Sequence, residues 1–299
     1  MNKAIALALG FLMLNQPQAN AQTMIQKNNI TLSSDLMTPE ALWAMGRIGG
    51  AQASPDGKQV VYQVSYYSVK ENKSHTMLFV QPIKPDKKTA APTQLTSDNK
   101  SETDASWIEN GQKIAFLREG QLWKMNPDGS GRVQLTNSNT DIEGFKFSPD
   151  GKRVILIKSL PYYGSIQKKP SDLPKSTGRL VTDLNFRHWD HYVESIPHPF
   201  LADVNGNTVS EGIDIMEGEP YECPTAPFGG IEQIDWSKDS KQVAYTSRKK
   251  TGVDYAVSTD ADIYLYNIDT RETKNLCKPM GYKEPRIDPT KSLRNQSVN

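Results

Sequence analysis

Three histidines and an aspartate lie close together in the chain, and all four side chains are possible metal ligands. They are His188, Asp190, His191 and His198. Imidazole and carboxylate groups commonly bind zinc, and the i, i+3 spacing of His188 and His191 would let both rings converge on a helix. The alternative is an aromatic cluster whose polar edges are hydrogen-bonded. Because no further ligand set accompanies these residues, we favour the cluster and predict no metal site and no cofactor.

The two cysteines, Cys223 and Cys277, leave two interpretations open. They are too few for a disulfide framework, but one bridge would be possible in an oxidising compartment. Cys277 closes one repeat of the chain and Cys223 precedes the first strand of that same repeat, so the two thiols could be close. The other interpretation is a pair of free thiols. The lysine pairs Lys168-Lys169 and Lys249-Lys250 are expected to be solvated.

The elements that must position these residues are built from a recurring turn. Ser148-Pro149-Asp150-Gly151 is preceded by an aromatic residue and followed by an apolar run, the pattern of a hairpin between buried strands. Similar units are Ala53–Tyr62, Trp107–Phe116 and Trp236–Tyr245. The aromatic residues in register (Trp107, Trp236, Phe147, Tyr62 and Tyr245) are expected to belong to the core.

The spacing of the repeats indicates the architecture. The turn residues 57, 111, 151 and 240 are 54, 40 and 89 residues apart, and a period of about 40 to 50 residues is typical of propeller blades. Two further strand-like pieces follow each hairpin, which makes four strands per unit. A stacked β-sandwich gives no reason for the same turn to recur in register. We therefore predict an all-β fold, a β-propeller of four-stranded blades.

The predicted propeller is incomplete and interrupted. It covers residues 37–291, with about four blades and the start of a fifth at Pro285–Lys291, and an irregular tail follows at 292–299. The double-length interval predicts an insertion at about 160–198. Because four blades and a stub would leave unpaired sheet edges, we expect the chain to be part of something longer.

The N-terminus reads as a signal peptide at residues 1–21. Lys3 is followed by the apolar run Ala4–Leu14 and by the small-residue site Ala19-Asn20-Ala21, so the mature chain would begin near Gln22. This predicts a periplasmic or secreted protein with no membrane span after cleavage, because the apolar run is shorter than the ~20 residues that a span needs.

A flexible leader is expected at residues 22–36, before a short helix over residues 38–45. Thr38 suits its N-cap, Pro39 suits its first position, and Gly49-Gly50 are expected to stop it. We expect the helix to pack beside the first blade.

The overall composition excludes some partners. The chain has 299 residues, 35 basic and 34 acidic, for a formal net charge of +1. A nearly neutral chain gives no electrostatic case for binding nucleic acid or an acidic membrane surface.

Three longer runs carry a family resemblance: Arg187–His191, Gly229–Gln233 and Lys249–Tyr266. With the repeats, they resemble the N-terminal propeller of exported bacterial peptidases of the prolyl oligopeptidase family, of the dipeptidyl-peptidase V or acylaminoacyl-peptidase type. The resemblance extends from about Met37 to Tyr282. Members join a seven- or eight-bladed propeller to a C-terminal α/β-hydrolase domain, whose Ser-Asp-His triad has its serine on a Gly-x-Ser-x-Gly elbow.

The sequence departs from this family at the catalytic residues. It contains no Gly-x-Ser-x-Gly, and its nearest approach, Gly129-Ser130-Gly131, lies in a blade turn. The chain stops before the hydrolase domain would begin, and the sequence after Pro289 looks like a truncated or frameshifted end. The triad therefore corresponds to no residue here, and we expect the chain alone to be inactive.

The resemblance also implies a role for a group of carboxylates and aromatic rings. An enzyme that removes dipeptides must hold the protonated α-amine of its peptide substrate at a fixed distance from the nucleophile. In relatives the propeller face supplies such groups. The candidates here are Trp189, Tyr192, Glu194, Glu217, Glu219, Tyr221, Glu222 and Glu232. The alternative is that the acidic residues of Glu217–Glu222 are a solvated loop.

Two functions remain open at this stage. The first is the propeller portion of an exported serine peptidase, which would gate peptide substrates and dock the absent hydrolase domain. The second is a propeller like that of the TolB translocation protein, which shares the Ser-Pro-Asp-Gly-Lys repeats and would bind protein partners without catalysis. The long insertion and the run Lys249–Tyr266 argue for the first.

Overall fold

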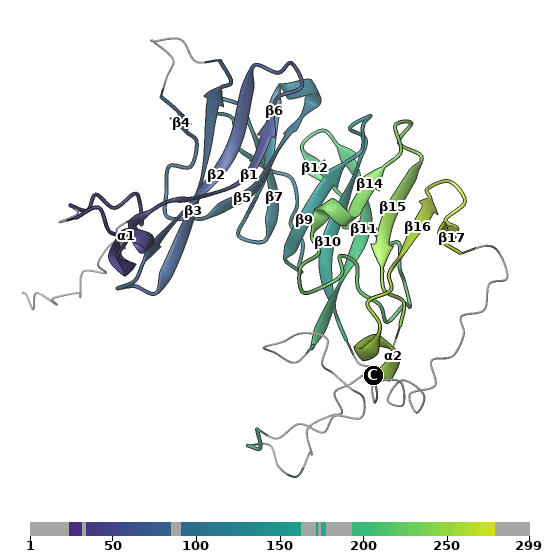
Figure 1. Cartoon of the computed structure of the whole chain (residues 1–299). Coiled ribbons are helices and arrows are strands. Elements are labelled where there is room, and N and C mark those ends of the chain that lie inside the picture. Colours follow the sequence, from purple (N-terminus) through teal and green to yellow (C-terminus); the bar gives the residue numbers. More distant parts are fainter. Residues whose placement is uncertain are drawn as a thin grey trace, which may run out of the picture.

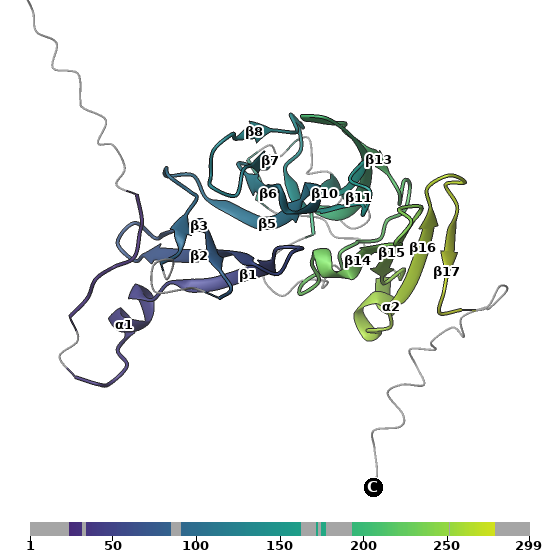
Figure 2. The same cartoon turned by 90° about the horizontal axis from the view of Figure 1, so that it is seen from above.

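Four antiparallel sheets follow one another in an arc along the chain (Figures 1 and 2). This computed structural model describes residues 24–31, 34–84, 91–162, 172, 175–177, 193–250 and 252–278. Sheet one contains β1 (Arg47–Ala53), β2 (Gln59–Ser68), β3 (Lys73–Pro82) and β4 (Thr93–Gln94). Sheet two contains β5 (Glu102–Ile108), β6 (Lys113–Arg118), β7 (Gln121–Met125) and β8 (Val133–Gln134).

Sheet three contains β9 (Ile142–Phe147), β10 (Arg153–Pro161), β11 (Ser195–Asn205), β12 (Thr208–Val209) and β13 (Ile213–Asp214). Sheet four contains β14 (Ile234–Trp236), β15 (Gln242–Ser247), β16 (Asp262–Asn267) and β17 (Thr273–Asn275). In sheets one, two and four the spatial order of the strands is their order in the chain; in sheet three both β12 and β13 pair with β11. The predicted propeller of four-stranded blades is confirmed. The expected fifth repeat lies outside the described residues.

The recurring turn owes its shape to its serine and aspartate. The Ser148 hydroxyl donates to Asp150 Oδ1 at 2.6 Å, and the same oxygen accepts the backbone N–H of Lys152 at 3.0 Å. Gly151 has φ +69°, which a glycine adopts without strain. The equivalent aspartates Asp56 and Asp239 accept the same two hydrogen bonds. These turns fix the register of the first two strands in sheets one, three and four.

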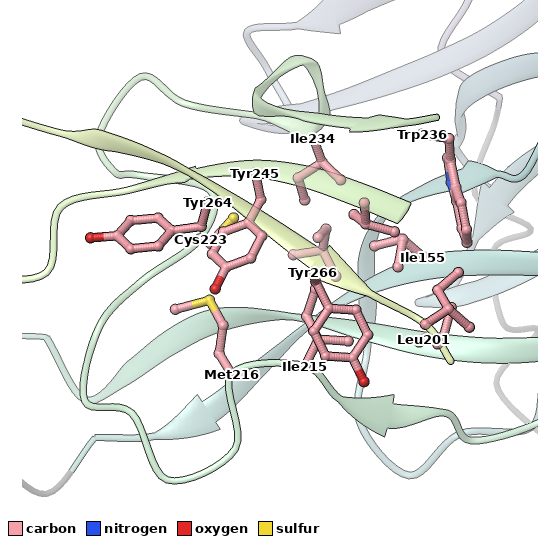
Figure 3. Close-up of a cluster of buried hydrophobic side chains, with 13 residues drawn as sticks. Ile155, Leu201, Ile215, Met216, Cys223, Ile234, Trp236, Tyr245, Tyr264 and Tyr266 are labelled. Atoms are coloured by element: carbon pink, nitrogen blue, oxygen red, sulfur yellow. The ribbon is translucent and has the colours of Figure 1, made fainter. Parts of the chain in front are cut away.

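Three apolar clusters each lie between two consecutive sheets, and a smaller fourth cluster in the described residues contains Tyr162, Val193 and Ile196. The cluster between sheets one and two contains Val61 and Phe116, and the cluster between sheets two and three contains Leu117 and Leu156. Figure 3 shows the third cluster, between sheets three and four, where Ile155, Leu201 and Tyr245 are buried together with the aromatic residues Tyr264, Tyr266 and Trp236. The aromatic residues predicted to be core differ in exposure: Trp107, Trp236 and Tyr245 are buried, whereas Tyr62 and Phe147 are half-buried.

The short N-terminal helix forms where the sequence predicts it, but it ends for another reason. In α1 (Pro39–Ala44), Thr38 is the N-cap and its hydroxyl accepts the backbone N–H of Ala41 at 3.2 Å. The ring of Trp43 packs edge-on against Tyr67 of β2 at 5.5 Å, so the helix lies beside sheet one as expected. The expectation that Gly49-Gly50 stop the helix is wrong, because both lie inside β1. The helix ends at Met45, whose backbone is extended.

The insertion between β10 and β11 contains fewer residues than the predicted range of 160–198, because both strands extend into that range. β10 and β11 remain paired out to Pro161 and Ser195, so the hairpin projects beyond the other strands of sheet three. β11 therefore begins at Ser195, inside the predicted insertion. A second helix, α2 (Gly252–Val257), connects β15 to β16, and no feature of the sequence predicted it. Two single-turn 3₁₀ helices complete the fold, η1 (Glu109–Gly111) and η2 (Ile231–Gln233).

The predicted signal peptide at 1–21 and the tail at 292–299 lie outside the described residues. Within the described ranges, no helix is both long enough and apolar enough to cross a bilayer.

Candidate substrate-binding face

One face of the arc collects the long connections of the chain. The tight turns join the first and second strands at one edge of each sheet, so the links from β10 to β11 and from β15 to β16 emerge at the opposite edge. The segment from β13 to β14, residues 215–233, returns to that same edge because β13 is antiparallel to β11. Figure 1 shows α2 at this end of sheet four. We call the edge of the sheets from which these three links emerge the connection face. It contains most of the predicted site residues.

Glu222 is fixed in the interior of this face. Its side chain is fully buried, and the Tyr255 hydroxyl of α2 donates a hydrogen bond to its carboxylate. The Ser247 hydroxyl donates to the Glu222 backbone carbonyl at 3.0 Å, and the Arg248 guanidinium lies 3.7 Å above the Tyr255 ring. Burial, with the Glu222 carboxylate second, raises the pKa of Tyr255 to about 12. Glu222 therefore ties the 215–233 segment to α2 and is not presented to solvent.

Glu219 forms an ion pair at the edge of the same core. Lys249 Nζ lies 2.6 Å from both of its carboxylate oxygens and 4.1 Å from the centre of the Tyr264 ring. The prediction that Lys249 and Lys250 are solvated is wrong. Both side chains are largely buried, and Lys250 pairs with Asp260 at 3.4 Å. The aliphatic parts of both lysine side chains cover apolar surface, while their ammonium groups form ion pairs with carboxylates of other segments.

A pocket of about 300 Å³ opens beside this ion pair. It is lined by Leu160, Pro161, Tyr162, Ile196, His198, Asp214, Gly218, Glu219 and Pro220. The walls therefore come from the projecting β10–β11 hairpin and from the 215–233 segment. An apolar pocket with a few polar groups at its wall is the common form of a small-ligand site.

His198 lines the pocket and is fixed there by two hydrogen bonds. Its Nδ1 lies 2.8 Å from Asp214 Oδ2 and its Nε2 lies 2.8 Å from the Tyr221 backbone carbonyl oxygen, and the side chain is almost fully buried. Both partner atoms are acceptors, so the ring satisfies both when each nitrogen carries a proton. The sequence interpretation of a hydrogen-bonded histidine is confirmed for His198.

The other proposed metal ligands, His188, Asp190 and His191, lie outside the described residues. Within the described part of the chain, no group of three or more His, Cys, Asp or Glu side chains is arranged to hold a metal ion.

The remaining carboxylates differ in their surroundings. Glu194 and Glu217 are exposed, at the start of β11 and directly before Gly218 of the pocket. Glu232 is also exposed, but its carboxylate accepts the backbone N–H of Gly230 at 2.8 Å and so stabilises its own turn. The structure brings Glu219 and Tyr221 to the pocket region, where Tyr221 packs on the third core cluster. Trp189 and Tyr192 lie outside the described residues.

Both cysteines are free thiols in the structure. Cys223 is buried in the third core cluster near Tyr245 (Figure 3), whereas Cys277 is exposed, and its sulfur accepts the backbone N–H of Ile263 at 3.3 Å. Burial raises the pKa of the Cys223 thiol far above its usual range.

Sequence reasoning missed Asp214, Arg248 and Tyr255, which complete these networks. Asp214 and Tyr255 are partners of His198 and Glu222, from which they are 16 and 33 residues away in the chain, and Arg248 lies over the ring of Tyr255. The run Lys249–Tyr266, which carried the family resemblance, was the signal that pointed to this region.

The four sheets form part of a β-propeller. Dipeptidyl-peptidase 5 of Porphyromonas gingivalis is 42% identical over 265 residues, which cover 87% of this chain and 38% of that protein. Dipeptidyl-peptidase 5 of Porphyromonas endodontalis is 40% identical over 257 residues, covering 84% of this chain and 37% of that protein. The chain thus spans less than half the length of these curated relatives. No family model matches it.

A solved structure agrees with the fold. The acylaminoacyl peptidase of Pyrococcus horikoshii superposes with a TM-score of 0.51 at 14% identity, over 79% of this chain and 33% of that one. At this identity the likeness shows the fold alone. Together with the two sequence relatives, it confirms the resemblance to the propeller portion of a prolyl oligopeptidase-family peptidase of the dipeptidyl-peptidase type. The alternative, a TolB-like binding module, has weaker support.

Proposed function

We propose that this chain serves as the propeller portion of an exported serine dipeptidyl-peptidase, in which it admits peptides by size and docks an α/β-hydrolase domain. The observation that carries the proposal is the 42% identity to dipeptidyl-peptidase 5 over nearly the whole chain. Cleavage would be acyl transfer on a serine supplied by the hydrolase domain, with histidine as base and aspartate orienting it. The sequence contains no Gly-x-Ser-x-Gly motif.

The connection face would bind the N-terminus of the peptide. A protonated amine needs a carboxylate that reaches solvent. Glu222 is buried against α2, and the charge of Glu219 is neutralised by Lys249. Exposed Glu217 adjoins Gly218 of the pocket, so we assign the ammonium contact to Glu217 and the apolar wall to Pro161 and Tyr162.

Binding and turnover test the two parts separately. The purified chain should not release p-nitroaniline from dipeptidyl p-nitroanilides, and turnover above background would contradict the assignment of catalysis to another domain. An alanyl-alanine dipeptide with a free amine should bind, as measured by NMR shift titration, and its N-acetyl form should bind at least tenfold more weakly, because a hydrogen bond between charged groups contributes about 1.5–3 kcal/mol.

Two matched variants locate the contact. Glu217→Gln should weaken binding of the free dipeptide by about tenfold or more. Glu232→Gln changes an equally exposed glutamate that stabilises only its own turn, and should leave binding unchanged. Equal affinities for the free and acetylated dipeptides would remove the ammonium site from the proposal.

Export is the third element of the proposal. Residues 1–21 would act as a cleaved signal peptide and place the protein in the periplasm or outside the cell. Expression in a Gram-negative host followed by N-terminal sequencing tests this. A mature start near Gln22 in the periplasmic fraction supports export, whereas an intact Met1 in the cytoplasm contradicts it.

A further inference from the structure

An indole hydrogen bond joins neighbouring sheets at two of the three junctions in the arc. Between sheets one and two, the Trp107 Nε1–H donates to the Gln52 carbonyl oxygen at 3.0 Å. Between sheets three and four, the Trp236 Nε1–H donates to the Lys146 carbonyl oxygen at 2.9 Å. Both tryptophans stand four residues before their turn residues 111 and 240, and both acceptors stand five residues before turn residues 57 and 151. The two bonds are therefore the same interaction of the repeat.

The junction between sheets two and three lacks this bond. The residue in register with the two tryptophans is Phe147, whose ring carries no N–H group. The acceptor in register with the Gln52 and Lys146 carbonyls is the carbonyl oxygen of Ser106 in β5. This junction has the ring and the acceptor position of the repeat, but its chain supplies no indole donor.

The side chains that reinforce the other two junctions are also absent here. The Gln52 amide oxygen accepts the backbone N–H of Trp107 at 2.7 Å, and Lys146 Nζ donates to the Ile234 carbonyl oxygen at 2.6 Å. Ser106 stands in the register position of both side chains and is shorter than either. In the part of the chain that the structure describes, Ser106 forms no hydrogen bond to sheet three.

The turns themselves also meet less closely at this junction. Between sheets three and four, the Ser240 hydroxyl oxygen accepts the backbone N–H of Asp150 at 3.1 Å. The residue of sheet three in register with Ser240 is Gly151, and a Cβ atom added to Gly151 would meet no atom within 4 Å. Between sheets one and two, a Cβ atom added to Gly111 would lie only 3.2 Å from Pro55 Cδ. The turns of sheets two and three thus leave space that their neighbours fill.

A pocket of about 500 Å³ lies where these contacts are absent. Its lining includes Ser106, Gly151 and the rings of Trp107, Phe145 and Phe147. The two phenylalanine rings meet edge to face, with their centres 5.9 Å apart. A pocket of this volume with apolar rings and a few polar groups is the common form of a small-ligand site. It opens at the turn edge of the sheets, the edge opposite the connection face.

The charged groups around this pocket already have partners. Lys124 Nζ lies 2.8 Å from Glu109 Oε1, and Lys146 Nζ lies 3.1 Å from Asp235 Oδ1. The Asp150 carboxylate accepts the two hydrogen bonds of its own turn. A ligand therefore needs no net charge to enter. The group that the neighbouring junctions have and this one lacks is an N–H donor on a flat aromatic ring.

We propose that the pocket between sheets two and three binds an indole, which donates its N–H to the Ser106 carbonyl oxygen and packs its rings against Trp107 and Phe147. The ligand would supply the donor that the other two junctions obtain from tryptophan. Free indole and the tryptophan side chain of a peptide share this chemistry. The site does not involve the ammonium contact at Glu217, so this proposal and the proposed function can fail independently.

NMR shift titration of the purified chain with indole and with 1-benzofuran tests the proposal. Indole should bind saturably and shift the resonances of Ser106 and Phe147. Benzofuran has the same ring shape with an oxygen in place of the N–H, so it should bind about fivefold more weakly. Absence of saturable indole binding overturns the proposal. Equal affinities for the two compounds overturn the hydrogen bond to Ser106.

N-acetyltryptophanamide distinguishes the two sources of the indole. Binding as tight as that of indole, with the same shifted resonances, supports a tryptophan side chain as the natural ligand. Binding of indole alone supports the free heterocycle. Shifts from either compound that lie only outside the pocket contradict the site.

A substitution that fills the pocket from within the chain locates the ligand. Phe147→Trp supplies the donor that the junction lacks, so it should weaken indole binding by tenfold or more and raise the urea concentration at the unfolding midpoint. Because this variant gains a contact, loss of binding cannot be attributed to unfolding, and circular dichroism checks its fold. Phe228→Trp is the control, since Phe228 is 77% exposed in the 215–233 segment, and it should leave binding unchanged. A Phe147→Trp variant that binds indole as tightly as the original chain contradicts the proposal.

Discussion

The ion pair between Lys249 and Glu219 provides the sharpest test of the connection face. Lys249→Met keeps most of the aliphatic stem that lies over Tyr264 and removes the ammonium that contacts both Glu219 oxygens at 2.6 Å. The Lys249 side chain is 17% exposed and that of Glu219 is 31% exposed. The carboxylate would therefore keep part of its hydration and lose its counter-charge.

The magnitude follows from this intermediate burial. Two unit charges about 3 Å apart attract by about 5 kcal/mol at an effective dielectric constant of about 20. Desolvation and the ordering of a long side chain offset most of that attraction. Because Glu219 still contacts water, we expect a net coupling between Lys249 and Glu219 of about 1–2 kcal/mol, between the values for exposed and for fully buried pairs.

A double-mutant cycle measures this coupling directly. Lys249→Met, Glu219→Gln and the double variant are unfolded in urea at neutral pH, and the interaction energy is the part of their effects that is not additive. Lys100 and Glu119 form the control pair, because their side chains are 52% and 54% exposed. That pair should couple by less than about 1 kcal/mol. A Lys249–Glu219 coupling no larger than the control would refute the reasoning from burial.

Three further predictions concern single titrating or reactive groups. The pKa of Tyr255 is about 12 in the folded protein, whereas that of an unfolded tyrosine is ~10. Because the unfolded chain loses this proton at lower pH than the folded protein, the free energy of unfolding falls between about pH 10 and 12. Tyr255→Phe should reduce that fall in urea titrations, and an unchanged slope would contradict the buried hydroxyl. A serine hydroxyl lowers the pKa of Asp150 below that of the unfolded chain. This stabilisation is present above about pH 4 and is lost below it. Asp150→Asn should therefore reduce the fall in melting temperature at acidic pH, and an unchanged fall would contradict the stabilising role of the Asp150 carboxylate in the turn. Cys277 should react with Ellman's reagent in the folded protein, and Cys223 should react only after unfolding. Reaction of both thiols at the same rate in the folded protein would contradict the burial of Cys223.

The repeats could be predicted from sequence because each one depends on chemistry within a few residues. Ser148, Asp150 and Gly151 make a turn that is shaped by hydrogen bonds from the Ser148 hydroxyl and the Lys152 backbone N–H to Asp150, all within a few residues. The alternation of the following strand then decides which side chains enter the core. Local chemistry also placed Thr38 at the start of α1. It failed at Gly49-Gly50, because pairing with β2 overrides the tendency of two glycines to interrupt regular structure.

The candidate site could be predicted only in part, because its residues act through distant partners. Glu222 looked like its neighbour Glu217 in sequence, yet a tyrosine 33 residues later makes one a buried anchor and leaves the other exposed. Lys249 looked like a solvated cation for the same reason. A run of charged residues does not reveal which of its members face a partner from another segment.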